Sequence, residues 1–522
     1  MASSLTPSPA PDSRAVEPEE IHRAKLRWVK DGHSGPIPTN VEWINQLPPG
    51  EQARYRGYVL RKPSRTLSGV AVVAVMTAPA RCPHGRCTYC PGGLENASPQ
   101  SYTGEEPSAL RGAQLHFDSR AITEQRLKTL DALGHSTSKV EVIVMGGTFP
   151  SRPTSYQESV FQGIYDGLNG SSNPTLALAQ AANETAAHRC VGLTVETRPD
   201  WCDGRVLPKL LEAGVTRIEL GVECLRDEVL LRIGRAHGVE DVIAASREAR
   251  DRGLKVCYHL MLGLPGMSPE KDLEDFRRLF RDGSYQPDML KIYPTLVLPG
   301  TELFEDWKRG AYEPYDLSTA ADLIAREKLL LPPWVRIQRI QRDIPARLIA
   351  AGVRTSNIRE VALRRLRELG GRCRCLRCRE VGRRATPSPN SLDPIERRYP
   401  AAGGEEIFLS WEDDGTESVA GFLRLRFPSS ATEGGLTDPV IRELKVLGVE
   451  LPVGSAPKGE TEYQHQGLGK RLVGWAEQLA AERGFRNLWV TSAVGSRAYY
   501  RRLGFSPKGT HMAKPVFSSR KT

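Results

Sequence analysis

Three closely spaced cysteines, Cys82, Cys87 and Cys90, have the residue type and the spacing of an iron-binding loop. Three thiolates can hold three irons of a [4Fe–4S] cube, whereas a fully ligated cluster takes four. The remaining iron is then free to chelate the amino and carboxylate groups of S-adenosylmethionine, and its cleavage to a 5′-deoxyadenosyl radical is the cofactor's own chemistry. Tyr89 fits packing against the adenine. The alternative is a zinc knuckle, which needs a fourth ligand such as His84.

A glycine motif and a charged motif favour the iron–sulfur interpretation. Gly146 and Gly147 follow an expected second strand and expose backbone where the amino group of a methionine could bind. Alone, a Gly-Gly pair is usually a turn, but here it follows the cysteine loop in register. Glu196 and Arg198 end a third expected strand, so they are candidates for contacts to S-adenosylmethionine or substrate. An ordinary salt bridge is the alternative.

A second cluster, Cys373, Cys375 and Cys378, is dense enough for three thiolates to share one metal ion. We expect Zn²⁺, held tetrahedrally with a fourth ligand from elsewhere, in a closed structural site. The sequence does not name that ligand, and His465, His511 or a non-local Asp are candidates. A second iron–sulfur cluster is the alternative. The remaining four of the ten cysteines are scattered and are expected to be small core residues.

A glycine-rich turn in the C-terminal part predicts a pyrophosphate site. Gln466, Gly467 and Gly469 belong to a Q-x-x-G-x-G pattern that opens a helix, so several backbone N–H groups are unpaired at the helix N-terminus. The pattern resembles the acetyl-CoA loop of the GNAT superfamily of N-acetyltransferases. In that fold the preceding strand, residues 442–446, would lie beside the pantetheine. The segment with Tyr499 and Tyr500 resembles the superfamily's C-terminal helix, where a tyrosine faces the thioester.

Six apolar, β-branched runs are expected to be buried parallel strands that position the first site. They cover residues 71–76, 140–145, 191–196, 215–222, 254–261 and 288–295. Helix-like stretches separate most of them, at 120–133, 205–213, 239–252 and 270–281. Repeated β–α units build an open barrel whose active site lies at the C-terminal strand ends. We therefore predict an α/β fold with a partial (β/α)6 barrel and a lateral opening for a large substrate.

Changes in composition predict five segments. These are a disordered N-terminus (1–20), a basic N-terminal segment facing an RNA (21–66), the barrel (67–310), a helical linker with the second cysteine cluster (311–400), and a GNAT-like α/β domain (401–522). Within the linker, residues 311–370 are expected to be largely helical and residues 383–394 have the composition of a connecting loop.

The chain is basic, because 72 Lys and Arg residues face 62 Asp and Glu residues and give a formal net charge of +10. Such a surplus suits a polyanionic partner, since each cation that meets a phosphate releases counterions. A merely well-solvated surface is the alternative. No stretch approaches a membrane span, and the polar start lacks the apolar core of a signal peptide. We expect a cytoplasmic enzyme without a membrane partner.

Taken together, the motifs resemble the catalytic subunit of Elongator in its bacterial or archaeal stand-alone form. The resemblance runs from about Arg23 to the C-terminus. Its motifs occupy residues 68–76, 82–93, 100–111, 139–150, 191–200, 291–305, 340–345, 464–469 and 499–505. The family implies a fused radical-SAM and acetyltransferase-like enzyme that acts on the wobble uridine in the anticodon loop of tRNA and forms 5-carboxymethyluridine.

The resemblance also implies a mechanism. The radical would take hydrogen from the acetyl methyl group, the carbon radical would add to C5 of uracil, and hydrolysis of the thioester would leave a carboxymethyl group. Acetyl-CoA would contact Lys139, Glu443, Leu444, Lys445, Val446, Leu468, Gly469, Lys470 and Tyr500. Tyr499 and Tyr500 are the catalytic candidates, for positioning the thioester or its attacking water, with aromatic packing as the alternative.

Two departures from the family pattern fall near the expected S-adenosylmethionine site. The family often has Gln and then Ser or Thr where this chain has Glu223 and Cys224. The segment 234–237 replaces a more usual N-R-G-H. Its Arg235 and His237 remain candidate pocket residues.

The predicted partners are tRNA and an unidentified electron donor, and a homodimer is one assembly left open. The expected phosphate contacts are the arginines of 334–347 and the residues Arg61, Lys62, Arg65, Arg372, Arg374, Arg377 and Arg379. The main alternative function is a histone-type protein lysine acetyltransferase with a vestigial barrel. The complete cysteine loop and glycine motif count against it.

Overall fold

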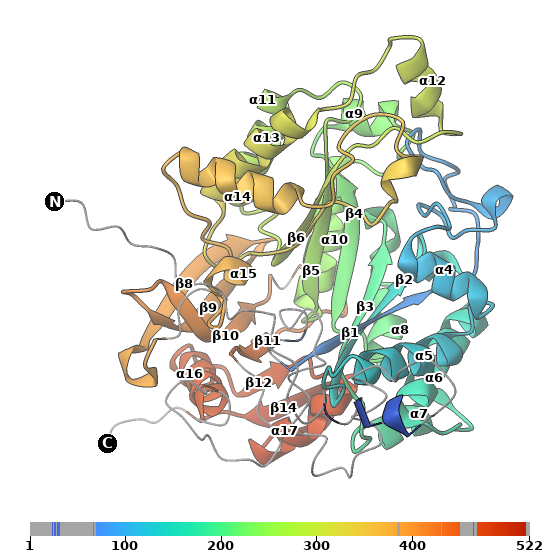
Figure 1. Ribbon diagram of the computed structural model, residues 1–522. Helices are drawn as coiled ribbons and strands as arrows, with labels where there is room; N and C mark the ends of the chain where they lie inside the picture. Colours follow the sequence, from blue (N-terminus) through green and yellow to red (C-terminus); the bar gives the residue numbers. More distant parts are fainter. Residues whose placement is uncertain are drawn as a thin grey trace.

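The computed structural model contains two seven-stranded sheets, each with helices packed against it (Figure 1). It describes residues 23, 26, 27, 29–31, 66, 69–383, 387–429, 431–448, 463 and 467–517. The expectations for residues 1–20 and most of 21–66, including Arg61, Lys62 and Arg65, and for His465 and Gln466, lie outside these residues.

The first sheet is an open parallel barrel with its strands in sequence order. Its strands are β1 (Ala71–Met76), β2 (Lys139–Met145), β3 (Arg189–Thr197), β4 (Arg217–Glu223), β5 (Lys255–Leu262), β6 (Met289–Pro294) and β7 (Arg336–Ile340). Buried branched residues such as Val73, Val142 and Ile218 form its outer face. Covering helices exclude water from that face, as an all-parallel sheet requires.

Helices connect the strands and wrap the outside of the barrel (Figure 1). They are α4 (Pro107–Gln114), α5 (Ser119–Ala132), α6 (Thr154–Asn169), α7 (Leu176–Asn183), α8 (Leu207–Glu212), α9 (Asp227–Arg232), α10 (Val239–Asp251), α11 (Pro269–Arg281), α12 (Glu302–Lys308), α13 (Leu317–Leu330), α14 (Ile358–Glu368) and α15 (Leu376–Arg379). None of the helices among the described residues has the length and apolar character to cross a bilayer.

The partial barrel is confirmed, and it has one strand more than the six that the sequence predicts. The additional strand, β7, pairs in parallel with β6 and lies inside the stretch expected to be largely helical. Its sequence RIQRI buries Ile337 and Ile340, while the residues between them are polar. A short strand with such an alternation does not have the continuous apolar run of its neighbours, which is why it was not predicted.

The second sheet has the strand order β13-β14-β12-β11-β10-β9-β8. Its elements are β8 (Asp393–Ala401), β9 (Gly404–Asp413), β10 (Ser418–Phe427), β11 (Val440–Val446), β12 (Asn487–Val490), β13 (Ser506–Lys508) and β14 (His511–Pro515), with α16 (Leu468–Glu482) and α17 (Arg497–Arg502). The edge strand β8 begins at Asp393, ahead of the boundary expected at 401. Most of its side chains are solvent-accessible, and its sequence, DPIERRYPA, resembles that of a loop.

A buried network of ion pairs joins the two sheets. Arg442 of β11 places Nη1 2.7 Å from Oδ2 of Asp288, which precedes β6, and Nη2 2.7 Å from Oε2 of Glu406 in β9. Arg250 of α10 reaches Glu406 at 3.0 Å. These four side chains are fully buried, and removing one would leave a buried charge without its partner. The network therefore fixes the second domain against the barrel.

Candidate active site

The loop after β1 brings the first cysteine triad to the mouth of the barrel. Cys87 and Cys90 are buried and Cys82 is partly exposed. Thr88, between them, donates its backbone N–H to Ile233 and accepts from Leu303, so both neighbouring segments hold the loop. Among the described residues, the triad is not one of the groups whose ligand atoms all lie within 4.8 Å of one another. This wider spacing fits a multi-iron cluster better than the single ion of a zinc knuckle, although His84 Nε2 lies 3.2 Å from Cys87 Sγ.

Polar side chains surround the sulfur atoms. The Gln100 amide lies 3.2 Å from Cys90 Sγ, the Thr148 hydroxyl 3.7 Å from Cys82 Sγ, and the Arg235 guanidinium 3.8 Å from Cys87 Sγ. Burial raises the pKa of the Cys87 thiol to about 11, although Arg235 opposes this shift. Such hydrogen bonds and charges are the means by which a protein tunes an iron–sulfur cluster.

The glycine motif lies directly beside this loop. Gly146 and Gly147 have φ of 134° and 85°, which disfavour any residue with a side chain. A Cβ on Gly146 would lie 2.2 Å from Thr77 Oγ1, and one on Gly147 would lie 3.5 Å from Cys82 Sγ. The positive φ favours glycine at both positions, Gly146 also has no room for a side chain beside Thr77, and Gly147 lies next to Cys82.

A cavity at the mouth brings several predicted residues together. Its lining includes Cys82, Tyr89, Gly147, Glu196 and Arg198. Glu196 accepts hydrogen bonds from Tyr102 and from Lys291, each at 3.1 Å. Arg198 pairs with Asp200, as the alternative predicted, but its Nη1 is buried without a hydrogen-bond partner among the described residues. Both side chains therefore line the cavity, and hydrogen bonds to neighbouring residues fix their positions.

The departures from the family pattern also lie at this mouth. Glu223, with φ of 68°, forms an ion pair of 3.3 Å with Arg235. Arg235 in turn lies beside Cys87. His237 is buried, and burial followed by the charge of Arg235 lowers its pKa to about 2, so the imidazole is neutral. Glu223 and Arg235 thus form a charge pair next to the cysteine loop.

A second cavity, of ≈520 Å³, lies between the N-terminal ends of the barrel strands and the second domain. It brings together all the residues that the resemblance assigns to acetyl-CoA, and also Gly467 of the glycine-rich turn and Tyr499. These are Lys139, Glu443, Leu444, Lys445, Val446, Gly467, Leu468, Gly469, Lys470, Tyr499 and Tyr500. Lys139 comes from the barrel and the others from the second domain, so the two domains form this cavity jointly.

Helix α16 points its N-terminus at this cavity. Gly467 precedes the helix with φ of 77°, and open space surrounds its missing side chain. A Cβ on Gly469 would lie 2.6 Å from the hydroxyl of Tyr499, so the two segments approach closely. Tyr500 is buried and packs its ring against Phe505. The first backbone N–H groups of α16 can therefore receive a pyrophosphate beside the two tyrosines.

Apart from Lys139, sequence analysis missed the residues that the barrel contributes to this cavity. Arg189, Lys255, Arg217 and Glu141, from four different strands, line it, as does Arg502 of α17. Burial, with Glu443 opposing, lowers the pKa of Lys255 to about 8. The only available signal was a charged residue near the start of most of the predicted strands, where a barrel wall should be apolar.

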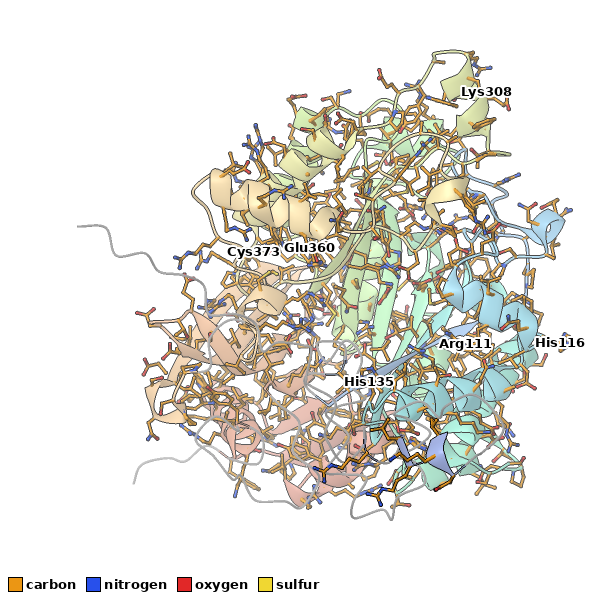
Figure 2. The ribbon with its side chains drawn as sticks, in the orientation of Figure 1. Arg111, His116, His135, Lys308, Glu360 and Cys373 are labelled. Atoms are coloured by element: carbon orange, nitrogen blue, oxygen red, sulfur yellow. The ribbon has the colours of Figure 1, made fainter. Side chains whose placement is uncertain are left out.

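The second cysteine triad has a compact geometry. The thiols of Cys373, Cys375 and Cys378 lie within 4.8 Å of one another, which fits one metal ion. Figure 2 places Cys373 near α14, the helix that carries Glu360. The buried Lys328 of α13 has its Nζ 3.2 Å from Cys373 Sγ. The proposed ligand His511 is not in this group, since its Nε2 contacts the Arg252 carbonyl at 2.9 Å.

The arginines predicted to contact phosphates fall into two classes. Arg339 and Arg342 line the cavity at the barrel mouth, and Arg372 and Arg374 are exposed. Arg379 is buried, and it pairs with Glu412 and donates to the Glu417 carbonyl at 3.0 Å. That prediction is wrong for Arg379, because its guanidinium holds the linker onto the second domain.

Family models match three consecutive parts of the chain. The Radical SAM superfamily matches residues 77–280, the Radical_SAM C-terminal domain matches 287–368, and the Acetyltransferase (GNAT) family matches 378–505. The first and third imply a [4Fe–4S] cluster with S-adenosylmethionine and a site for acetyl-CoA. The two cavities occupy the corresponding regions.

Relatives match almost the whole chain. The tRNA uridine(34) acetyltransferase of Methanocaldococcus infernus is 43% identical over 97% of this chain and 96% of its own length. Elongator complex protein 3 of Homo sapiens is 41% identical over 95% of this chain and 93% of its own length. A solved structure of the archaeal Methanocaldococcus infernus Elp3 with an N-terminal deletion has a TM-score of 0.77 and 41% identity, covering 86% of this chain and all of that one.

Proposed function

The chain belongs to the family of Elongator complex protein 3 and the tRNA uridine(34) acetyltransferases, and from that premise we propose that it carboxymethylates the wobble uridine of tRNA. S-adenosylmethionine, acetyl-CoA and a reductant are the co-substrates. The observation that carries the proposal is the pair of cavities on one barrel, one beside the cysteine loop and one beside the N-terminus of α16.

Residues of the first cavity bind and orient the cofactor. When bound, the cluster and S-adenosylmethionine supply a radical that takes a hydrogen atom from an unactivated carbon. We assign the three loop cysteines to the irons and Gly146 and Gly147 to the methionine group. Glu196 and Arg198 face the same cavity and are assigned to S-adenosylmethionine or the uridine. Gln100 and Arg235 stabilise the negative charge of the thiolates by donating hydrogen bonds to their sulfur atoms.

Residues of the second cavity bind the acyl donor. The N-terminus of α16, with Gly467 to Lys470, receives the pyrophosphate, and the β11 residues Glu443 to Val446 lie along the pantetheine. Lys139, Arg189 and Lys255 add positive charge that suits the phosphates. Tyr499 and Tyr500 position the thioester or the water that hydrolyses it.

The target base must leave the anticodon loop to reach the first cavity. A single-stranded loop allows this at low cost, because its bases are unpaired. Arg339 and Arg342 line the mouth and are placed to contact the adjacent phosphates. For the second triad, zinc is the proposed ion, with a structural role. The electron donor, a cytoplasmic location and a homodimer stay predictions.

An anaerobic reaction tests the proposal. Reconstituted full-length protein is incubated with tRNA, S-adenosylmethionine, acetyl-CoA and a reductant, and nucleosides are analysed by mass spectrometry. We expect 5-carboxymethyluridine only when all components are present, and none from Cys87→Ser, which should still bind CoA. The matched control is Cys202→Ala, a buried cysteine outside the loop.

The same assay addresses the lysine acetyltransferase. That activity predicts acetylated peptide without S-adenosylmethionine or reductant, and it is not favoured by the names of the relatives. Modification of tRNA that persists in Cys87→Ser would contradict the proposed function.

A further inference from the structure

The two cavities lie at opposite ends of the same three strands. On β2, Glu141 lines the acyl-donor cavity and Met145 the mouth cavity. On β3 the corresponding residues are Gly192 and Glu196, and on β4 they are Arg217 and Glu219. Alternate residues of a strand face the same side, so one continuous inner face connects both sites. Any group that reacts at both must cross it.

The crossing is short. At a rise of about 3.3 Å per residue, Arg217 and Glu219 are about 7 Å apart along β4, and Gly192 and Glu196 about 13 Å apart along β3. An extended pantetheine arm is longer than either span. Gly192 also leaves room at the entrance, because a Cβ there would lie 3.1 Å from the side chain of Glu141. The acyl end of the donor can therefore enter the barrel while its phosphates stay at α16.

The inner face is polar, unlike the apolar interior expected of a barrel. Arg217 forms ion pairs with Glu141 and with Glu219, the latter at 3.2 Å. Glu219 also contacts His259 at 2.8 Å and Lys291, and Lys291 reaches Glu196. Three carboxylates thus face two cations. An added anion would meet repulsion here, whereas a neutral carbonyl would not.

Two donors on this face lack partners. Arg217 Nη2 and Thr194 Oγ1 are buried without a hydrogen-bond partner among the described residues, and the two side chains are 3% and 1% exposed. Thr194 pairs in register with Arg217, so the two residues are neighbours across β3 and β4. Leaving such groups unsatisfied costs about 1–3 kcal/mol each, so a ligand oxygen that accepts from them would remove this cost.

We propose, on the basis of the proposed function, that the acyl end of acetyl-CoA lies along the inner face of β2 to β4, with its thioester carbonyl bound by Arg217 and Thr194. Arg217 Nη2 and the Thr194 hydroxyl donate to the carbonyl oxygen. The methyl group then points past Glu219 toward the mouth cavity. Arg217 and Thr194 are positioning residues for the acetyl group.

A reactive donor tests this placement without requiring turnover. In chloroacetyl-CoA a thiolate displaces chloride from the carbon next to the carbonyl, forming a C–S bond and releasing chloride. The reconstituted variant Thr194→Cys is treated with chloroacetyl-CoA in a Cys257→Ala background, so that this neighbouring thiol does not compete, and labelling is mapped by peptide mass spectrometry. The matched control is Leu193→Cys, which faces the opposite, helix-covered side.

We expect chloroacetyl-CoA to label position 194 at least ~100-fold faster than chloroacetamide does at equal concentration, because binding supplies a high effective concentration. Free CoA should suppress the labelling, and Leu193→Cys should show no such preference. Equal rates for both reagents at position 194, while chloroacetyl-CoA binds the protein, would overturn the placement. The outcome is independent of tRNA modification, so failure of the proposed function would appear separately as unmodified tRNA.

A second measurement covers the case in which Thr194→Cys does not fold. Arg217→Lys keeps a cation between Glu141 and Glu219 but loses the Nη2 donor. Calorimetry compares CoA with an analogue whose thioester sulfur is replaced by CH₂, giving a stable ketone. We expect the preference for the ketone over CoA to fall by about 3- to 10-fold, the loss of one hydrogen bond. An unchanged preference would overturn the role of Arg217.

Discussion

The thiols of Cys373, Cys375 and Cys378 lie within 4.8 Å of one another, whereas those of Cys82, Cys87 and Cys90 are spread around a loop at the edge of a cavity. The compact triad leaves little room for anything but one ion, and it lies under α13 with Lys328 against Cys373. The wide triad opens toward Gly147 and Glu196. In the proposed function the cysteines thus form a closed structural site and an open reactive one, and the two sites differ in the spacing of their sulfur atoms.

The largest expected effect comes from breaking the open triad. Cys90→Ser removes a thiol that accepts from Gln100 and should lower the iron content and reduce tRNA modification below detection, because the cluster needs all three ligands. Iron and sulfide are counted per chain, and nucleosides are measured by mass spectrometry. Zinc content should be unchanged. Modification by an iron-depleted Cys90→Ser would remove the distinction between the triads.

Breaking the closed triad should lower the stability of the protein. Cys375→Ser should release the ion and lower the free energy of unfolding by several kcal/mol, since metal binding contributes directly to folding. Thermal unfolding and zinc content are measured against Cys202→Ala. Iron at the first triad should stay bound in the folded fraction. If wild-type protein carries iron and no zinc at the second triad, the alternative of a second iron–sulfur cluster is correct.

A substitution next to the open triad should weaken cofactor binding without removing the cluster. Gly147→Ala adds a Cβ 3.5 Å from Cys82 Sγ at a φ of 85°. Because the added methyl group shifts backbone that is assigned to the methionine group, we expect a cost of about 1–3 kcal/mol in the bound state, which is a roughly 5- to 150-fold loss of S-adenosylmethionine affinity. Gly170→Ala is the matched control, because it has a similar φ of 69° but nothing within 4 Å. Equal affinities in the two variants would contradict the assignment of Gly147.

The last predicted effect is a pH dependence of stability at Asp272 of α11, which packs near α13. Burial raises the pKa of Asp272 from its ordinary value of 3.8 to about 7, although Tyr315 and the Gly263 N–H oppose this shift. Burial, and then the charge of Asp272, raises the pKa of Glu327, which precedes Lys328. Between pH 4 and 7 the unfolded chain has lost the Asp272 proton while the folded chain keeps it. Stability therefore falls as pH rises through this window, by up to about 1.4 kcal/mol per pH unit, and is constant above it.

Asp272→Asn removes this titration and retains an oxygen for the Tyr315 and Gly263 donors. The variant should gain stability relative to wild type as pH rises from 5 to 7 and show no further gain above pH 8. Denaturant unfolding at each pH gives the difference. A difference that does not vary with pH would show that Asp272 is ionised in the folded protein.

The two triads were predictable because their cysteines lie close together in the sequence. The strands β1 to β6 were predictable because each is one continuous apolar run, which is also a local pattern. The strands β7 and β8 were missed, since the polar residues of RIQRI and the loop-like composition of 393–401 do not have that pattern. The ion pairs of Arg217, Glu219 and Lys291 could not be predicted, because strand register alone brings them together across β4 to β6. The polar character of the inner face between the two cavities therefore becomes visible only in the folded structure.

Transfer of deuterium from acetyl-CoA tests the central claim most directly. The reconstituted protein is given acetyl-CoA deuterated at the methyl group, together with tRNA, S-adenosylmethionine and a reductant. The proposed mechanism predicts deuterium in 5′-deoxyadenosine and in the methylene group of 5-carboxymethyluridine. Formation of 5-carboxymethyluridine together with 5′-deoxyadenosine that contains no deuterium would contradict it.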